Sequence, residues 1–358
     1  MTRFHCRTRI ISGSGALQAI REFAPRRLLV VADPYFAKNG TAARIAAFAP
    51  DSAVFDKVQP DPPVTLAAEG VAFMRSFDPD MVVALGGGSA LDCAKAMVYF
   101  ADSSAKLVAV PTTSGSGSEV TDFSILTHDG TKHPLVDPSL QPDVAILDDD
   151  LLRELPRGLI ADTGFDVLAH ALEAMVGKNA GAITDALARD AFCTACVALP
   201  ASYAGDRSAR LPMHTASAMA GMAFSQAGLG LCHAASHALG GLYHVPHGRL
   251  NAVLLPAVLE ANIPAAGAKY AALARSAGLG GTADALAVRS LKNTLVRLRR
   301  ELGLPATLAE AGIDRRQLFR DRERLLHSVL ADPCCVTNPV PVTRDLAAAV
   351  LDEVTGRG

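Results

Sequence analysis

The stretch MVVALGGGSALDCAKA, residues 81–96, decides how the N-terminal half of this chain is expected to fold. Its first five residues form an apolar run of strand length, as in a strand covered on both faces of a sheet. Gly86, Gly87, Gly88 and Ser89 follow and open a helical pattern. Backbone N–H groups and the positive end of a helix can face a phosphate there, although a tight turn explains such a loop about as often as a ligand site does.

Short apolar runs alternate with helical spacings through residues 1–150 on both sides of this stretch. Strands are predicted at Leu28–Ala32, Met81–Leu85, Leu107–Val110 and Val144–Leu147, and helices at Ala16–Phe23, Thr41–Phe48, Val64–Phe77 and Ala90–Phe100. This alternation predicts an α/β unit with a parallel, doubly wound, Rossmann-like sheet, whose ligands bind beyond the carboxyl ends of the strands. The usual Gly-x-Gly-x-x-Gly fingerprint is absent, so a standard Rossmann site is not predicted.

Two further features fall at predicted strand ends. The segment PTTSGSGSE, Pro111–Glu119, follows one strand and offers hydroxyl groups and glycines to a ligand, or forms a turn. Asp33 ends the first strand, where an acid can accept hydrogen bonds from the hydroxyls of an adenosine ribose and favours NAD over NADP. Asp33-Pro34 is equally an ordinary turn opening, so spacing alone leaves both interpretations open.

The C-terminal half carries helical spacings without strand-like runs, so two domains are predicted, a dinucleotide-binding domain over residues 1–155 and an all-α domain over 156–358. The predicted helices are Pro156–Gly177, Ala180–Leu199, Arg210–Ala223, Ala252–Ala261, Ala268–Ala277, Ala283–Leu302, Leu308–Ala311, Arg315–His327 and Arg344–Val354. A length of 358 residues is compatible with two domains.

Histidines are concentrated in GLGLCHAASHALGGLYHVPHG, residues 228–248, which contains four of the ten in the chain. His233 and His237 are four residues apart and share one face of a helix, while His247 follows Pro246 and is expected on a turn or a new helix start. Asp166 and His170 have the same spacing in a second helix. Imidazoles with one carboxylate suit Fe²⁺ or Zn²⁺, and solvated surface histidines are the alternative interpretation.

Composition limits the classes of function. The formal net charge is −2 and no basic block is present, so nucleic acid and anionic membrane surfaces are not expected partners. No uninterrupted apolar run approaches the roughly 18–20 residues that span a bilayer, and a soluble, cytoplasmic protein is expected. The seven cysteines lack the spacing of a disulfide framework, and Cys193 and Cys196 are expected to be buried in a helix.

The chain resembles the iron-containing, or group III, alcohol dehydrogenase family, and within it the 1-propanol and ethanol dehydrogenase branch. The resemblance covers nearly the whole length. Its motifs are GGGSALDCAKA at 86–96, PTTSGSGSEVT at 111–121, KHPLVDPSLQPDVAILD at 132–148, ADTGFDVLAHALEA at 161–174, FSQAGLGLCHAASHALGG at 224–241 and VPHG at 245–248.

The resemblance implies roles for particular residues. In this family one aspartate and three histidines hold Fe²⁺, or alternatively Zn²⁺, and they match Asp166, His170, His233 and His247. His237 matches a histidine that lies near the metal without binding it, and we expect it to relay a proton. The positions matching dinucleotide contacts are Asp33, Gly86, Gly87, Gly88, Ser89, Asp92, Thr112, Thr113, Ser116 and Lys132. One departure is Arg249-Leu250: Leu250 stands where relatives usually have a small residue, and Arg249 adds a charge just past a ligand, so the pocket or a subunit contact is expected to differ there.

The implied activity is reversible hydride transfer between NAD(H) and a short-chain primary alcohol or aldehyde, in a pocket lined by aliphatic side chains, Phe165, Phe224 and Tyr243. The alternatives are a glycerol dehydrogenase, a maleylacetate reductase, a dehydroquinate-synthase-like lyase and a non-catalytic component of a bacterial microcompartment. The complete set of four metal ligands argues against the first two, and the lack of lysine and arginine within residues 224–248 argues against the lyase. Relatives form dimers or larger homo-oligomers, and a strand at Phe4–Ile11 is expected to pair across a two-fold axis.

Overall fold

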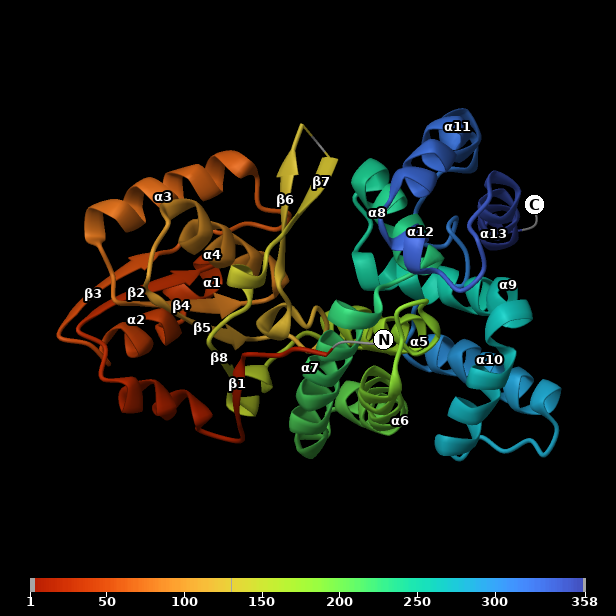
Figure 1. Cartoon of the computed structure of the whole chain (residues 1–358), viewed down its shortest axis with the longest axis horizontal. Coiled ribbons are helices and arrows are strands. Elements are labelled where there is room, and N and C mark those ends of the chain that lie inside the picture. The colour runs from red at the N-terminus through yellow and green to blue at the C-terminus, as the bar shows by residue number, and fades with distance from the viewer. Residues whose placement is uncertain (1–3, 130, 357–358) are drawn as a thin grey trace. The chain divides into compact units, whose positions relative to one another are not determined.

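The computed structural model describes residues 4–129 and 131–356. Internal contacts divide the chain into two compact units, one over His5–Leu155 and one that begins at Pro156. The first contains strands and helices, and within its described residues the second contains only helices (Figure 1).

A six-stranded parallel sheet forms the centre of the first unit, with strand order β1-β8-β5-β4-β2-β3. The fold-class prediction is therefore confirmed. The strands of this sheet are β1 (Arg9–Ser12), β2 (Arg27–Ala32), β3 (Asp51–Phe55), β4 (Met81–Gly86), β5 (Lys106–Pro111) and β8 (Val144–Leu147). The α-helices and 3₁₀ helices around it are η1 (Ala16–Phe23), α1 (Pro34–Lys38), α2 (Thr41–Ala46), α3 (Val64–Phe77), α4 (Gly88–Ala101), η2 (Ser118–Val120), η3 (Pro138–Leu140) and η4 (Asp149–Leu152).

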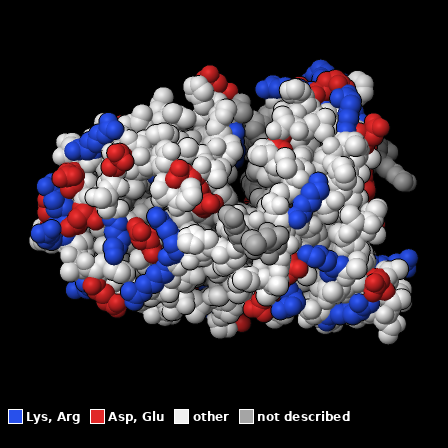
Figure 2. All heavy atoms as spheres, in the orientation of Figure 1, with Lys and Arg blue, Asp and Glu red and all other residues white. Residues whose placement is uncertain are grey.

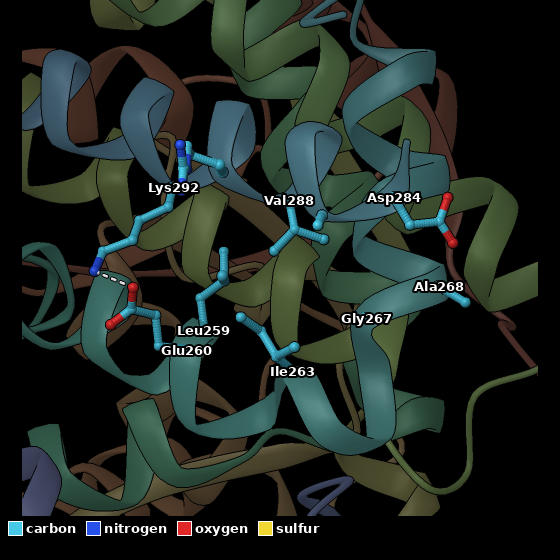
Figure 3. Close-up of a pocket in the computed structure, with 10 residues that line it drawn as sticks. Leu259, Glu260, Ile263, Gly267, Ala268, Asp284, Val288 and Lys292 are labelled. Atoms are coloured by element: carbon cyan, nitrogen blue, oxygen red, sulfur yellow. Dashed lines mark ion pairs between the residues drawn. The ribbon is translucent and has the colours of Figure 1, made fainter. Parts of the chain in front are cut away.

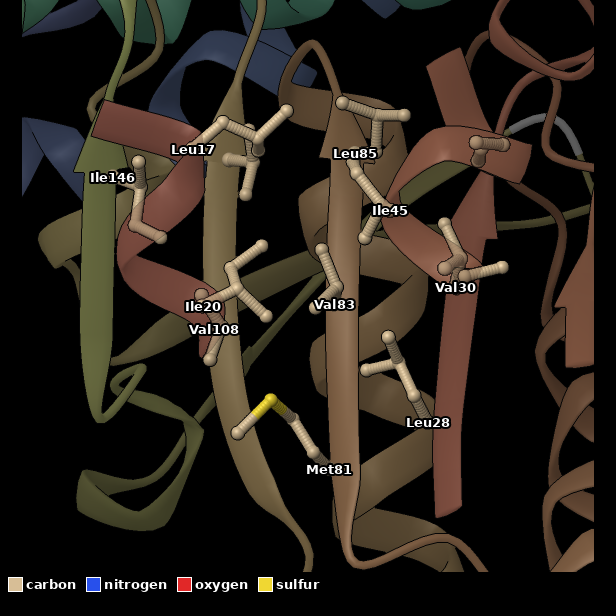
Figure 4. Close-up of a cluster of buried hydrophobic side chains, with 14 of the residues drawn as sticks. Leu17, Ile20, Leu28, Val30, Ile45, Met81, Val83, Leu85, Val108 and Ile146 are labelled. Atoms are coloured by element: carbon tan, nitrogen blue, oxygen red, sulfur yellow. The ribbon is translucent and has the colours of Figure 1, made fainter. Parts of the chain in front are cut away.

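Apolar side chains bury both faces of this sheet. On one face Val30, Val83 and Val108 pack against η1 and α2, as Figure 4 shows for Ile20 and Ile45. On the other face the alternate strand residues pack against α3 and α4. Two covered faces explain why the strands are continuous apolar runs instead of alternating ones.

The register of the sheet places three loops at one edge. Gly86 at the end of β4 pairs with Pro111 at the end of β5, and Leu85 pairs with Ala32 at the end of β2. The segments that follow these residues begin with Gly87, Thr112 and Asp33. They therefore start side by side at the carboxyl ends of the strands, where open α/β sheets bind ligands.

The second unit is a helical assembly. Helices α5 and α9 contact each other extensively, and α5 also packs on α6 and α7. The helices are α5 (Arg157–Val176), α6 (Ala182–Ala204), η5 (Arg207–Ala209), α7 (Arg210–Ala227), α8 (Leu231–Tyr243), α9 (His247–Ser276), α10 (Asp284–Glu301), α11 (Arg315–Ala331), α12 (Cys334–Thr337) and α13 (Arg344–Thr355).

Several predicted elements need correction. The two helices expected at 252–261 and 268–277 are one helix, α9, which continues through Pro256 and Pro264. A proline costs about 3 kcal/mol inside a helix, and the long buried face of α9 outweighs that cost. Helix α8 runs through Gly240 and Gly241 without a break. The predicted helix 308–311 is a turn, and the segment 16–23 is a 3₁₀ helix.

Three strands were not predicted. One is β3 at the edge of the main sheet, and the others are β6 (Phe123–His128) and β7 (Thr131–Val136), which pair antiparallel as a separate ribbon. Strand β6 is buried only at alternate positions and so lacks the continuous apolar run of the central strands. The expected strand at 4–11 is shorter and lies later, as β1.

Helix α9 is long and apolar enough to match a membrane span by length and composition, and 67% of its 18-residue apolar window is buried inside the protein. Its packing on α5 and α10 is that of a core helix. Cys193 and Cys196 lie on α6. Both are free thiols, and so are the other five cysteines, which lie elsewhere in the chain.

Candidate functional site

Helix α5 presents three acceptors to the interior of the second unit. Asp166, His170 and Glu173 are spaced i, i+4 and i+7, so they share one face of the helix. Their exposed fractions are 8%, 4% and 4%. Polar side chains at this depth need partners, because an unpaired buried polar group costs several kcal/mol.

Those partners come from α8 and from the start of α9. The Nε2 atoms of His233 and His247 each lie 3.6 Å from Asp166 Oδ1, and His170 Nε2 lies 3.9 Å from the same oxygen. The rings of His170 and His233 are stacked, with centroids 4.6 Å apart. The structure thus brings together all four residues that the resemblance implied as metal ligands.

The donor set fits a divalent cation. A tetrahedral ion with bonds of about 2.0–2.2 Å to nitrogen and oxygen separates its ligands by roughly 3.3–3.6 Å, close to the distances observed here. Asn251 Nδ2 lies 2.6 Å from Asp166 Oδ1, 3.2 Å from His247 Nε2 and 3.4 Å from His233 Nε2. One amide has two hydrogens and cannot donate to three acceptors at once. A cation satisfies them together.

Glu173 orients His233 from the opposite side. Its Oε2 lies 2.5 Å from His233 Nδ1, and its carboxylate also accepts from the backbone N–H groups of Gly230 and Cys232. Burial lowers the pKa of His233, but the charges and hydrogen bonds of Glu173 and Asp166 outweigh burial and raise it to about 9. The site therefore stabilises positive charge at this imidazole, and Glu173 fixes Nε2 as the atom that faces Asp166.

His237 lies one turn further along α8 and faces the same cluster. Its ring stacks on His247 with centroids 5.1 Å apart, and its Nδ1 lies 2.9 Å from Asp332 Oδ2. No direct contact joins it to Asp166 among the described ion pairs and hydrogen bonds. Its side chain is 24% exposed, so it borders solvent as well as the cluster.

Arg249 and Leu250, which depart from the usual pattern of relatives after His247, both make contacts within the helical unit. Arg249 forms a two-point ion pair with Asp162, with distances of 3.1 and 2.9 Å. Leu250 is fully buried in the same unit. A Cβ atom on Gly248 would lie 1.9 Å from the Asp162 carbonyl oxygen, so only glycine permits α9 to begin this close to α5.

Of the three aromatic residues expected in the pocket, Phe224 stacks on His170 with centroids 4.3 Å apart. Phe165 is fully buried on α5, and the Tyr243 hydroxyl donates to Asp321. Phe224 is therefore the one that the structure places against a member of the histidine cluster.

A separate group of predicted site residues lies at the strand ends of the first unit. Thr112 N–H donates to Gly86 O, a Cβ on Gly87 would lie 3.3 Å from Thr113 Oγ1, and one on Gly88 would lie 3.1 Å from Ser116 Cβ. The glycine loop and the threonine-serine loop thus pack directly against each other. Helix α4 begins at Gly88 without any side-chain cap, so its first N–H groups point to the loops.

The remaining predicted cofactor residues differ in their surroundings. Asp33 caps α1 by accepting from the N–H groups of Tyr35 and Phe36, so the turn interpretation holds for this residue whether or not it also meets a ribose. Asp92 Oδ1 accepts from Ser118 Oγ at 2.7 Å. Lys132, on β7, pairs with Asp61 at 2.7 Å.

Two charged side chains near these loops were not predicted. Lys95 is 1% exposed and its ammonium donates to the backbone oxygens of Thr121 and Phe123, which holds the second loop to α4. Glu119 is also 1% exposed, and its Oε1 has no hydrogen-bond partner among the described residues. Burial raises the pKa of Glu119 to about 7, and burial lowers that of Lys95 to about 8.

Neither of two other surface features adds a candidate site. A cavity of about 460 Å³ lies between α9 and α10, where Glu260 pairs with Lys292 and Ile263 is exposed (Figure 3). None of its lining residues belongs to the histidine cluster. On the face drawn in Figure 2, acidic and basic residues are interspersed.

Glu173, Asn251 and Asp332 are the site residues that sequence reasoning missed. Glu173 carries a usable signal, because it continues the i, i+4, i+7 face of Asp166 and His170. Asn251 follows His247 by four residues and would have been found in the same way. Asp332 lies 95 positions from its partner His237, so no local spacing points to it.

Comparison with known proteins gives one consistent result. Residues 7–149 match the iron-containing alcohol dehydrogenase family, and residues 160–355 match the C-terminal region of the Fe-containing alcohol dehydrogenase family. The 1-propanol dehydrogenase PduQ of Salmonella typhimurium is 39% identical, over 99% of this chain and 100% of that protein. The NADPH-dependent butanol dehydrogenase of Clostridium saccharobutylicum is 34% identical, over 96% of each chain.

Solved structures agree with these sequences. An iron-containing alcohol dehydrogenase from Thermococcus thioreducens has a TM-score of 0.92 and 33% identity, over 99% of this chain and all of that one. A 1,3-propanediol oxidoreductase has a TM-score of 0.93 and 31% identity, over 99% and 100%. A sulfoacetaldehyde reductase from Bifidobacterium kashiwanohense, in complex with NAD⁺, has a TM-score of 0.89 and 26% identity over both full lengths.

Proposed function

This chain belongs to the iron-containing alcohol dehydrogenase family, which uses NAD(H) and iron, and we propose that it interconverts short-chain primary alcohols and aldehydes. It is an oxidoreductase of the propanol branch of that family. The observation that carries the proposal is the convergence of Asp166, His170, His233 and His247 within one buried cluster. One carboxylate and three imidazoles are donors that accept Fe²⁺ or Zn²⁺.

We propose that these four side chains hold the metal, and that a bound divalent ion supplies Lewis acidity toward the substrate oxygen. Glu173 keeps the His233 ring in place, and Asn251 hydrogen-bonds the Asp166 carboxylate. Outer partners of this kind fix ligand orientation before any ion arrives. Burial of the cluster limits competing water, since His233 is 1% exposed and His170 is 4% exposed.

The dinucleotide is proposed to bind at the strand ends of the first unit. Gly87 and Gly88 lack side chains where Thr113 and Ser116 approach, so backbone N–H groups and hydroxyls are the groups available to a diphosphate. The uncapped start of α4 adds the positive end of a helix dipole. Asp33 Oδ1 accepts two backbone N–H groups, and Oδ2 lies 3.5 Å from the position that a Cβ atom on Gly86 would take, which supports a role for that oxygen toward a ribose of NAD. Ser89, Asp92, Thr112 and Lys132 are proposed to complete this site.

His237 is proposed to move the hydroxyl proton of the alcohol to solvent. Asp332 holds its Nδ1, which leaves Nε2 as the exchanging atom in the neutral ring. The partial exposure of the side chain provides the route outward. The side chain of His247 is also partly exposed, at 28%, but its Nε2 faces Asp166 as a proposed metal ligand. Glu173 holds His233 in the buried interior.

The substrate class follows from relatives and from the lining. The relatives act on propanol and butanol or are named for propanediol. Phe224 contributes an apolar surface beside His170, and Arg249 is neutralised by Asp162. An uncharged, short aliphatic alcohol or aldehyde is the substrate these surroundings favour.

We also propose a soluble, cytoplasmic protein, with residence inside a microcompartment as an option. It would be a homodimer or larger homo-oligomer, paired through β1, an edge strand of the sheet.

The test combines metal analysis of anaerobically purified protein with NADH oxidation across short aldehydes. We expect Asp166→Asn to lose the metal and to lower kcat/KM by more than the roughly 100-fold that losing an outer partner can cost. His237→Ala should keep the metal and lose only turnover. NADH binding, followed by fluorescence, should be unchanged in both variants. An Asp166→Asn protein that keeps its metal and its activity would overturn the proposal.

A further inference from the structure

A second group of potential metal donors lies beside the first in the helical unit. One donor atom from each of His237, Asp332 and Cys334 lies within 4.8 Å of the other two. The group shares no residue with the cluster of Asp166, His170, His233 and His247. It combines an imidazole nitrogen, a carboxylate oxygen and a sulfur.

The backbone holds these three donors in place. Asp332 directly follows α11, and Cys334 is the first residue of α12. Asp332 Oδ1 accepts from the Cys334 backbone N–H at 2.8 Å, while Oδ2 lies 2.9 Å from His237 Nδ1. The carboxylate therefore links the other two residues. A donor group arranged before binding loses less conformational freedom when an ion arrives.

We propose that His237, Asp332 and Cys334 form a second cation site, selective for zinc, adjacent to the metal site of the dehydrogenase. All three residues are partly exposed, and the side chains of His237 and Asp332 are 24% and 13% exposed, so an ion can reach the group from solvent. Zinc accepts nitrogen, oxygen and sulfur ligands in one tetrahedral site, and water can take the fourth position.

The distances permit such a site after small movements. Zinc bonds of about 2.0–2.3 Å place tetrahedral ligands roughly 3.3–3.8 Å apart, so the 2.9 Å contact between Asp332 and His237 must open by less than about 1 Å. The other pairs already lie within 4.8 Å. The harder ion Mg²⁺ would gain little from this set, because imidazole and thiolate are not its preferred ligands.

Local charge also favours a cation. Burial raises the pKa of the Cys334 thiol, and the neighbouring carboxylates of Asp332 and Glu173 raise it further. Those carboxylates create a negative electrostatic potential at the sulfur, and this potential attracts a divalent cation. On binding, the thiol gives its proton to solvent. The Nδ1 hydrogen of His237, held by Asp332, also passes to solvent while Nε2 takes up one proton, so the ring stays neutral. The carboxylate and the thiolate then balance the two charges of the ion.

Occupancy would have a functional consequence that rests on the proposed role of His237. An ion on Nδ1 replaces the hydrogen bond that this atom donates to Asp332 and fixes a ring that is proposed to move a proton. Excess zinc should therefore inhibit the enzyme without removing the metal from the first site. The binding itself does not depend on the proposed function.

Cobalt(II) is the probe that separates the two sites. The first donor group contains no sulfur, so a sulfur-to-cobalt charge-transfer band reports the second site alone. We expect this band, and two bound cobalt ions per chain, in wild type and in Cys335→Ser. Cys335 is a matched control, because it is the adjacent free cysteine and is not in the donor group. Cys334→Ser should lack the band and bind one ion.

Zinc inhibition of the metal-loaded enzyme supplies the second measurement. Losing an outer partner of a metal ligand lowers metal affinity by at least about tenfold, and losing a direct ligand should lower it at least as much. Inhibition of Cys334→Ser should therefore require at least about tenfold more zinc than inhibition of wild type. Asp332→Asn is a second variant for the cobalt band. The inference is overturned if wild type binds only one ion, or if Cys334→Ser keeps the band. Failure of the proposed function gives a different result, an intact band in a protein with no dehydrogenase activity.

Discussion

The metal-donor cluster and the dinucleotide loops of this protein are built in opposite ways. The donors come from α5 and, much later in the sequence, from the consecutive helices α8 and α9, and each helix contributes side-chain atoms. The loops follow β4 and β5, which are neighbours in one sheet, and they offer mostly backbone groups and small hydroxyls. A site made of side chains depends on the ligand atoms that each side chain provides. A site made of backbone groups depends on residues whose side chains are small enough to leave those groups accessible.

This difference predicts different sensitivities to substitution. In the metal cluster, changing a carboxylate to an amide should matter although the shape is preserved. In the loops, adding a single methyl group should matter although no hydrogen bond is removed. Gly86→Ala and Glu173→Gln test that contrast, and Glu119→Gln tests a buried side chain beside the loops.

The largest effect is expected from Gly86→Ala in the loops. Gly86 has a φ of 151°, and a Cβ atom there would lie 2.6 Å from Ala90 Cβ. The positive φ alone costs a non-glycine residue of order 1–3 kcal/mol, and the overlap adds to it. NADH titration should show a large loss of affinity with the metal content unchanged. Thr113→Val is the control, since losing one hydroxyl contact costs about 0.5–1.5 kcal/mol. Similar NADH affinities for the two variants would contradict the contrast.

The next effect concerns Glu119, the buried carboxyl group beneath these loops. Because burial raises its pKa from 4.5 to about 7, the folded protein holds this proton more tightly than the unfolded chain. Stability is therefore lost as pH rises from about 4.5 to 7, by up to roughly 3 kcal/mol at 1.36 kcal/mol per pKa unit. Glu119→Gln removes this titration. Urea unfolding at pH 5 and pH 8 should show the variant gaining stability relative to wild type at the higher pH. An unchanged difference between the two pH values would show that Glu119 does not titrate in this way.

The smallest of the three effects is expected from Glu173→Gln in the metal cluster. The amide keeps the size of the side chain, but it cannot accept from His233, Gly230 and Cys232 together. Removing an outer partner of a metal-bound histidine typically lowers metal affinity by about 10–100-fold. Competition with a chelator measures this directly. Asp190→Asn, an exposed change on α6, should leave the affinity at the wild-type value. Equal affinities for Glu173→Gln and Asp190→Asn would mean that Glu173 has only a structural role.

The elements that sequence predicted well are those with a strong local pattern. The central strands are continuous apolar runs because both faces of the sheet are covered, and their predicted bounds agree with the structure within two residues. The ribbon of β6 and β7 was missed because the buried alternate positions of β6 are Ser124 and Leu126, so its sequence does not alternate between apolar and polar residues as a typical half-exposed strand does. Helix α9 was divided in two because prolines were given more weight than its burial.

The site was recognised from motifs and not from spacing. His233 and His237 have identical helical spacing to Asp166 and His170, so spacing cannot tell that His233 faces Asp166 while His237 faces Asp332. Neither His247 nor Asn251 can be assigned to the cluster without knowing where α9 begins against α5. Gly248 fixes that position, through a close approach that no local pattern reveals.

The sequence by itself determined the order of strands and helices, the location of the glycine loops and the residue types available for a metal, because these depend on neighbours within a few positions. The tertiary structure alone decided which histidines converge, that Glu173 and Asp332 orient two of them, and that Arg249 pairs with Asp162. Those relations join residues 60 to 95 positions apart. They arise from the packing of helices against one another, and that packing depends on every buried face at once.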